Sequence, residues 1–355
     1  MKKSLIAFAV LGAFASAASA QSSVVLYGII DASVSHSTNQ TTAGGKKYSM
    51  DASTLLPSRW GVKGSEDLGN GLKANFRLES TLSIDTGTAG SLFDRNATVG
   101  LSSAGMGSLD IGRQDNLAFS ALIPVDPMGV AFAATNPNVA FGSMNNTGLY
   151  SAHGSSNGTT SALRQNNSVK YTAPAILGGL TFTGMYGFGE KAGDASASSY
   201  AGASASFTEG GLTANFTYAQ LKDATNGSTL RSYTGGGKFV INNEFTVKVT
   251  YAENEVNTTG RTIGVMGAGF DYAVSPTTTL TAAYYANRRS GDVKGKADQF
   301  VGVAKYAFSK RTTAYAAFSY AKAGSTAAKD QELGLFIGVG NKTATRTTVG
   351  LLHAF

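Results

Sequence analysis

The sequence has no cysteine, only six prolines and few charged side chains, which make up 14% of its 355 residues. Without cysteine, neither a disulfide framework nor a thiolate metal site is possible. After the first twenty residues, no apolar stretch reaches the ~20 residues that a membrane-spanning helix needs. A charged fraction this low is unusual for a soluble domain. These absences exclude a disulfide-bonded module and a helical membrane protein.

Catalytic motifs are also missing. His36, His153 and His353 are the only histidines, and the chain lacks H-E-x-x-H, G-x-S-x-G and Walker A sequences. No pair of carboxylates is marked out by its spacing. We therefore expect no catalytic residues, no metal, no cofactor and no nucleic-acid partner.

The first twenty residues have the features of an export signal. Lys2 and Lys3 precede an apolar run from Leu5 to Phe14, and Ala18-Ser19-Ala20 forms an A-x-A cleavage pattern. The alternative, a retained anchor helix, is disfavoured because the apolar run is too short to span a bilayer. We predict a signal peptide over 1–20 and one domain over 21–355.

What the sequence does contain is alternation with a period of two, typical of strands with one apolar and one polar face. In 72–79, apolar side chains occupy the even positions and polar side chains the odd ones. The same pattern recurs in 212–218 and 245–251. Seven short turn segments and eight long polar segments divide the alternating runs. Sixteen strands are predicted, at 23–36, 55–66, 72–81, 91–102, 107–114, 164–174, 179–189, 199–208, 212–221, 230–241, 245–252, 261–274, 278–288, 297–308, 312–322 and 342–355.

This organisation predicts an all-β fold, a 16-stranded antiparallel transmembrane β-barrel with short turns at one rim and long loops at the other. An even number of strands leaves no unpaired edge in lipid. The alternative is a soluble β-sandwich or adhesin, but arginine, lysine, asparagine and threonine recur on the second face, and a polar interior requires water. The even positions of 96–102 would make a poor lipid face, so we expect part of that wall to face another subunit.

Four segments resemble a known family. The ending Val349–Phe355 is similar to the Gly-Leu-x-His-x-Phe close of the trimeric general porins of Gram-negative bacteria. Three further segments are similar to other parts of that family: Ser23–Asp31, Ser58–Gly71 and Asn167–Tyr171. The resemblance implies a bacterial outer-membrane location, a homotrimer and a long third loop folded into the lumen. It also implies that Phe355 is read by the barrel-assembly machinery.

The longest segment between predicted strands, 115–163, corresponds to this third loop. A structureless loop of that length is usually functional or disordered. It contains apolar pieces at 117–125, 130–134 and 139–141, which packing against the inner wall would explain. The alternative is a long surface loop.

Several charged residues are candidates for the pore. Parity places Arg59, Lys63, Lys73 and Arg77 inward, and Arg164 and Lys170 share a parity. The resemblance implies that Arg59, Arg95 and Arg164 form the basic side of a constriction. Asp115 and Asp126 are the only acidic residues of 115–163, and Asp31, Glu79 and Asp110 are further wall candidates. For any single arginine, a salt bridge that stabilises the wall is the alternative role.

Aromatic residues near the predicted strand ends are candidates for the girdles at the membrane interfaces. Others among them would line the lumen or contact a neighbouring subunit. They are Tyr27, Trp60, Phe76, Phe188, Tyr218, Tyr251, Phe270, Tyr272, Phe300, Tyr306 and Phe355.

The function that these features favour is a general diffusion porin, a passive pore for ions and small hydrophilic solutes. The basic excess favours weak anion selectivity. Three alternatives stay open: a substrate-selective porin of the same fold, a surface adhesin or structural barrel, and a barrel-borne hydrolase. Outer-membrane lipid, permeating solutes and the assembly machinery are the expected partners.

Overall fold

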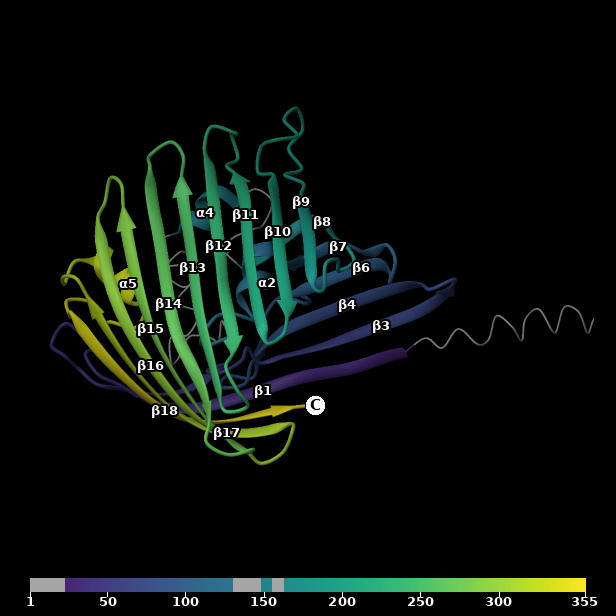
Figure 1. The fold of residues 1–355 in the computed structure, drawn as a ribbon. Helices are drawn as coiled ribbons and strands as arrows, with labels where there is room; N and C mark the ends of the chain where they lie inside the picture. Colours follow the sequence, from purple (N-terminus) through teal and green to yellow (C-terminus); the bar gives the residue numbers. More distant parts are fainter. Residues whose placement is uncertain (1–22, 130–147, 155–162) are drawn as a thin grey trace, which may run out of the picture.

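One closed sheet of antiparallel strands makes up most of the protein (Figure 1). The structure, a computed structural model, describes residues 23–129, 148–154 and 163–355. The predicted signal peptide and the apolar pieces 130–134 and 139–141 lie outside the described residues.

The strands follow one another around the sheet in chain order. In its first half they are β1 (Ser23–Ser37), β2 (Lys47–Ala52), β3 (Arg59–Gly69), β4 (Leu72–Ser83), β5 (Thr88–Ala89), β6 (Asn96–Ser103), β7 (Gly107–Asp115), β8 (Arg164–Thr172) and β9 (Leu180–Gly187). In its second half they are β10 (Tyr200–Glu209), β11 (Leu212–Lys222), β12 (Thr229–Val240), β13 (Phe245–Val256), β14 (Arg261–Ala273), β15 (Thr278–Ser290), β16 (Gly295–Ala307), β17 (Thr312–Ala323) and β18 (Thr343–Ala354).

The ring closes through β1. One edge of β1 pairs with β18, with Val34 opposite Val349, and the other edge pairs with β3 and then β2. Leaving aside the short β2 and β5, the described strands form a ring of sixteen. The prediction of a 16-stranded antiparallel barrel is therefore confirmed. The sequence did not predict β2 and β5, which lie within expected loops.

The two faces of the wall follow the predicted alternation. On β11, Thr213, Asn215 and Thr217 are buried on the inside, whereas Leu212 and Phe216 are exposed outside. Threonine and asparagine suit the inner face because each offers a hydrogen-bonding group to water or to a neighbouring side chain. The outer face is the apolar surface that lipid requires.

The wall at β6 differs from the expectation. Asn96 and Thr98 pair with Glu79 and Arg77, which lie on the inner face, and Val99 is exposed on the outside. The even positions of 96–102 therefore face inward and do not form a poor lipid face. The outer face there consists of alanine, valine and leucine.

Three short helices lie in two of the long connections, two between β7 and β8 and one between β17 and β18. They are α2 (Leu117–Leu122), α4 (Leu149–Gly154) and α5 (Ala328–Gly334). Within the ranges that the structure describes, no helix is long and apolar enough to cross a bilayer.

Candidate functional site

Three arginines surround one carboxylate on the inner face of β3 and β4. Glu79 Oε2 lies 2.6 Å from Arg77 Nη2 and 3.6 Å from Arg59 Nε, and Glu79 Oε1 lies 2.7 Å from Arg95 Nε. We call Arg59, Arg77, Arg95 and Glu79 the arginine cluster. Arg59 and Glu79 lie on the adjoining strands β3 and β4, and alternation places both side chains on the inner face. Arg95 comes from the segment just before β6. One buried carboxylate thus balances three guanidinium groups.

Tyr27 of β1 completes this cluster. Its hydroxyl donates to Glu79 Oε2 at 2.9 Å and accepts from Arg77 Nε at 2.9 Å. The Lys63 ammonium lies 5.2 Å from the centre of the same ring. Tyr27 was a candidate for a membrane girdle, but its side chain points inward. Its shared parity with Asp31 was the signal that could have identified it as a lumen residue.

Arg164 joins the cluster from the other side. Its Nε lies 2.8 Å from Asp115 Oδ1 and donates to the carbonyl of Arg95 at 3.0 Å. Its guanidinium also lies 4.8 Å from the centre of the Phe119 ring. The structure therefore brings Arg59, Arg95 and Arg164 together, as the resemblance implied.

Alternation alone does not account for Arg164. The ladder between β7 and β8 shifts between Gly112, opposite Ser168, and Gln114, opposite Gln165, which adds one residue to β8. Arg164 and Lys170 consequently do not share a face through simple parity. Arg164 reaches the cluster because it is the first residue of β8, where the chain leaves the loop.

The described part of the long third loop lies against the inner wall. All five apolar residues of α2 are buried, and α2 contacts β10, β11 and β12. The Asn116 side chain caps the helix by accepting from the Phe119 amide at 2.9 Å. Wall glycines make room for the loop: a Cβ at Gly236 would stand 2.7 Å from Val125 Cγ2.

Asp126 is buried in this contact. The Tyr285 hydroxyl donates to its two oxygens at 3.2 and 3.1 Å, and the Met128 amide donates to Oδ2 at 3.0 Å. Only 1% of Asp126 is exposed. The carboxylate thus ties the loop to β15, whereas Asp115 stays beside Arg164.

The second described piece of the loop, α4, is attached in a similar way. Tyr150 is buried, and it forms hydrogen bonds with Ser232 of β12 and Asn254 of β13. Burial raises the pKa of the Tyr150 phenol, although these hydrogen bonds act in the opposite direction. The phenol therefore stays neutral at neutral pH and acts as a fixed polar anchor.

The remaining predicted residues are spread along the wall. Lys73 is exposed on the inner face, and Lys170 pairs with Asp110 across the ladder. Asp31 is fully buried, where it accepts from the amides of Leu55 and Leu56 at 2.6 and 2.8 Å. Its role in the structure is to hold the segment before β3 against the wall.

A second charged group lies on the inner wall and was not predicted from the sequence. Lys238 of β12 stands directly opposite Lys248 of β13, and Lys248 Nζ lies 2.8 Å from Asp271 Oδ2 of β14. Strict alternation on these strands was the available signal. Among the residues that the structure describes, no group of histidine and carboxylate side chains could hold a metal ion.

Comparisons with known proteins agree with this architecture. A family model described as "Gram-negative porin" matches residues 7–326. An outer membrane porin protein of Bordetella pertussis is 36% identical over 193 residues, which are 50% of this chain and 46% of that protein. Outer membrane porin protein 32 of Delftia acidovorans is 38% identical over 231 residues, 64% of this chain and 62% of that protein. Each match spans less than two thirds of the relative's own length.

Solved structures extend the likeness to the whole barrel. An anion-selective porin from Comamonas acidovorans superposes with a TM-score of 0.79 at 25% identity, covering 94% of this chain and 100% of that one. The trimer form of OmpT from Vibrio cholerae has a TM-score of 0.65 at 18% identity, which supports the fold alone. Because the family model matches most of the sequence, the chain belongs to the Gram-negative porin family and is a protein of the bacterial outer membrane.

Proposed function

We propose that this protein forms a passive, water-filled pore for ions and small hydrophilic solutes. The observation that carries the proposal is a closed wall, apolar outside and polar inside, with the arginine cluster beside the third loop. A diffusion pore needs a constriction of fixed width and charge, not a catalyst. The chain is therefore a channel rather than an enzyme.

The constriction consists of the arginine cluster together with Arg164 and Asp115. Four arginines face two carboxylates there. The positive excess favours anions, because a confined charge acts strongly on an ion that has lost part of its hydration. The Comamonas acidovorans porin, described as anion-selective, supports weak anion selectivity for this chain. Lys63, Lys73 and Lys170 extend the basic lining along the wall.

The third loop narrows the pore at this level. Helix α2 (Leu117–Leu122) packs on the inner wall, and the ring of its Phe119 lies beside Arg164. Because Asp126 is buried and fixes the loop to β15, it does not line the constriction. The acidic side of the constriction therefore consists of Glu79 and Asp115.

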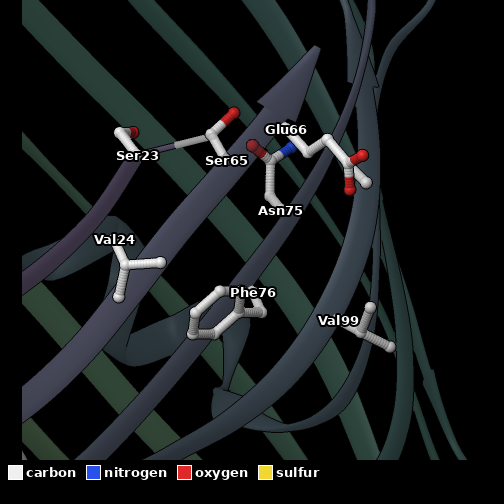
Figure 2. Close-up of a pocket in the computed structure, with 8 residues that line it drawn as sticks. Ser23, Val24, Ser65, Glu66, Asn75, Phe76 and Val99 are labelled. Atoms are coloured by element: carbon white, nitrogen blue, oxygen red, sulfur yellow. The ribbon is translucent and has the colours of Figure 1, made fainter. Parts of the chain in front are cut away.

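The protein assembles as a homotrimer after export. Figure 2 shows a hollow on the outer face of β1, β3, β4 and β6, lined by Val24, Phe76 and Val99 among others. Val24 and Val99 are exposed and Phe76 is half-buried, which leaves an apolar surface suited to another subunit. Residues 1–20 act as the signal peptide, 21–355 form the barrel, and Phe355 is the residue that the assembly machinery reads.

Single-channel recording in planar bilayers tests the pore and its selectivity together. We expect a stable conductance and a reversal potential in a potassium chloride gradient that indicates anion preference.

Arg95→Gln reduces this preference, whereas Arg311→Gln, on a short turn outside the pore, leaves it unchanged. The absence of conductance contradicts the pore, and a clear cation preference contradicts the proposed constriction. Block by one organic anion would instead favour a substrate-selective porin.

A further inference from the structure

Three lysines and one carboxylate gather on the inner wall, half-way around the ring from the arginine cluster. Lys238 of β12 stands directly opposite Lys248 of β13. Lys248 Nζ lies 2.8 Å from Asp271 Oδ2 of β14, and Lys305 of β16 interacts electrostatically with both Lys248 and Asp271. We call Lys238, Lys248, Lys305 and Asp271 the lysine cluster. Its three positive charges exceed its single negative charge.

The lysine cluster lies closer to the short turns than the arginine cluster does. Lys248 is the fourth residue of β13, and Lys305 is the third residue from the end of β16, so both are next to short connections. Glu79, by contrast, is the eighth residue of β4. Short turns form the periplasmic rim of such barrels. The lysine cluster therefore lines the lumen between the constriction and the periplasmic mouth.

The third loop covers the lysine cluster on the side of the constriction. A Cβ at Gly236 of β12 would stand 2.7 Å from Val125 Cγ2, and a Cβ at Gly269 of β14 would stand 2.7 Å from Pro127 Cβ. Gly269 is the ladder partner of Lys248, whose side chain is only 15% exposed. Packing of the loop against this part of the wall thus partly encloses the ammonium groups, which strengthens their attraction for an anion.

The stability of the wall does not explain this arrangement. Like charges directly opposite one another across a ladder destabilise a sheet. Asp271 offsets the charge of one lysine, and it also accepts a hydrogen bond from the Thr281 hydroxyl. Among the described residues, neither Lys238 nor Lys305 forms an ion pair. Two positive charges are therefore left to act on a solute in the lumen.

We propose that the lysine cluster binds a compact divalent oxyanion, of which hydrogen phosphate is the model, on the periplasmic side of the constriction. Lysine binds such an anion as a flexible point charge with three donors. Threonine hydroxyls add further donors, because Thr246 stands opposite Asp271 and Thr279 stands opposite Lys305 on the same inner face. The inference rests on the proposed pore and names a class of anion that this pore admits.

A double variant, Lys238→Gln with Lys305→Gln, tests the residues and keeps the Lys248–Asp271 pair. The probe is inorganic phosphate above neutral pH, followed by phosphorus NMR line width on the purified, detergent-solubilised full-length protein. We expect phosphate binding to weaken about tenfold or more, since each lysine supplies a charge-assisted hydrogen bond. The matched control, Lys310→Gln with Arg311→Gln, removes the same charge from an exposed short turn at the same rim and should leave binding unchanged. Equal affinities in the double variant and the wild type refute the proposal.

Asp271→Asn tests the same site with the opposite sign. The substitution keeps the size of the side chain and removes the negative charge that competes with the bound anion. Phosphate should then bind about threefold more tightly. If the lysines and Asp271 served only to stabilise the wall, this variant would bind phosphate no more tightly than the wild type, and that result would contradict the site.

Chloride conductance of the same preparations in planar bilayers distinguishes a failure of this site from a failure of the pore. A protein that binds phosphate through the lysine cluster but never conducts contradicts the pore alone. A conducting protein whose phosphate affinity is insensitive to both sets of substitutions contradicts the lysine site alone.

Discussion

At the scale of single residues, Glu79 is the carboxylate shared by three arginines of the proposed constriction. Its carboxylate contacts Arg59, Arg77 and Arg95, and Tyr27 holds it from the side. Arg77 keeps 42% of its side chain exposed, whereas Glu79 keeps 2%. A solute therefore meets guanidinium groups before it meets the carboxylate that balances them.

Glu79→Gln is expected to increase anion selectivity. The substitution keeps the size of the side chain and removes the negative charge from beside three arginines. We predict that the anion-to-cation permeability ratio rises about twofold or more, measured as the reversal potential in a salt gradient. Glu244→Gln, on an exposed short turn, serves as control. An unchanged or lower ratio in a correctly folded Glu79→Gln barrel would contradict this account of the cluster.

Single residues also show which parts of the site could be predicted from the sequence and which could not. Parity correctly placed Arg59 and Arg77 inside, because the period of two is a property of the strand itself. It did not indicate that Glu79 is the common partner, since the cluster combines residues from several strands. The role of Asp126 was equally inaccessible: its partner, Tyr285, is 159 positions away.

At the scale of elements, the proposed constriction depends on the contact between the third loop and the wall. Val125 packs on Gly236 of β12, and the Asp126–Tyr285 hydrogen bonds fasten the next residue to β15. Alternation predicted the strands well, because each must present one face to lipid. It did not predict α2, α5, β2 or the extra residue in β8, whose positions depend on packing inside the ring.

Gly236→Ala should lower single-channel conductance. The new Cβ would stand 2.6 Å from the Val249 carbonyl oxygen and 2.7 Å from Val125 Cγ2, so the loop must move away from the wall and into the lumen. Gly237→Ala is the matched control, because its Cβ would have no neighbour nearer than 3.8 Å. Equal conductance in both variants would show that the loop does not narrow the pore.

Tyr285→Phe is expected to loosen the attachment of the loop. It removes the hydroxyl that donates to Asp126 and leaves a buried carboxylate with fewer donors, which costs about 1–3 kcal/mol. Limited proteolysis of the folded protein should then cleave segment 115–163 about tenfold faster, as the locally open population grows. Tyr306→Phe, on the outer face, should show the wild-type rate. Unaltered cleavage in Tyr285→Phe would exclude this anchor.

At the scale of the whole molecule, the end of the chain helps to complete the ring. The amide of Phe355 donates to the Gly28 carbonyl at 3.0 Å, and the Gly28 amide donates back to Phe355 at 3.1 Å. The phenyl ring occupies the space beside Gly28, where a Cβ would stand 2.3 Å from Phe355 Cζ. The family resemblance predicts that Phe355 is an assembly signal, and the structure adds this packing contact with Gly28.

Phe355→Ala distinguishes the two roles of this residue. We expect several-fold less folded barrel in the outer membrane, measured by the mobility of unheated samples in detergent gels. Refolding from urea into detergent micelles should stay near the wild-type yield, because the machinery is absent there. Phe308→Ala, an exposed aromatic residue of a short turn, is the control. An equal loss in micelles would assign the defect to the packing and not to the signal.

The pairing of β1 with β18 has a consequence for biogenesis. The hydroxyls of Ser35 and Thr348 meet at 2.8 Å although 313 positions separate them. The first strand therefore has no partner on that side until almost the entire polypeptide has been synthesised and exported. During transit, two strand edges with unpaired amides and carbonyls are exposed to aggregation. A chain that ended before β18 would leave this edge of β1 unpaired and the wall open.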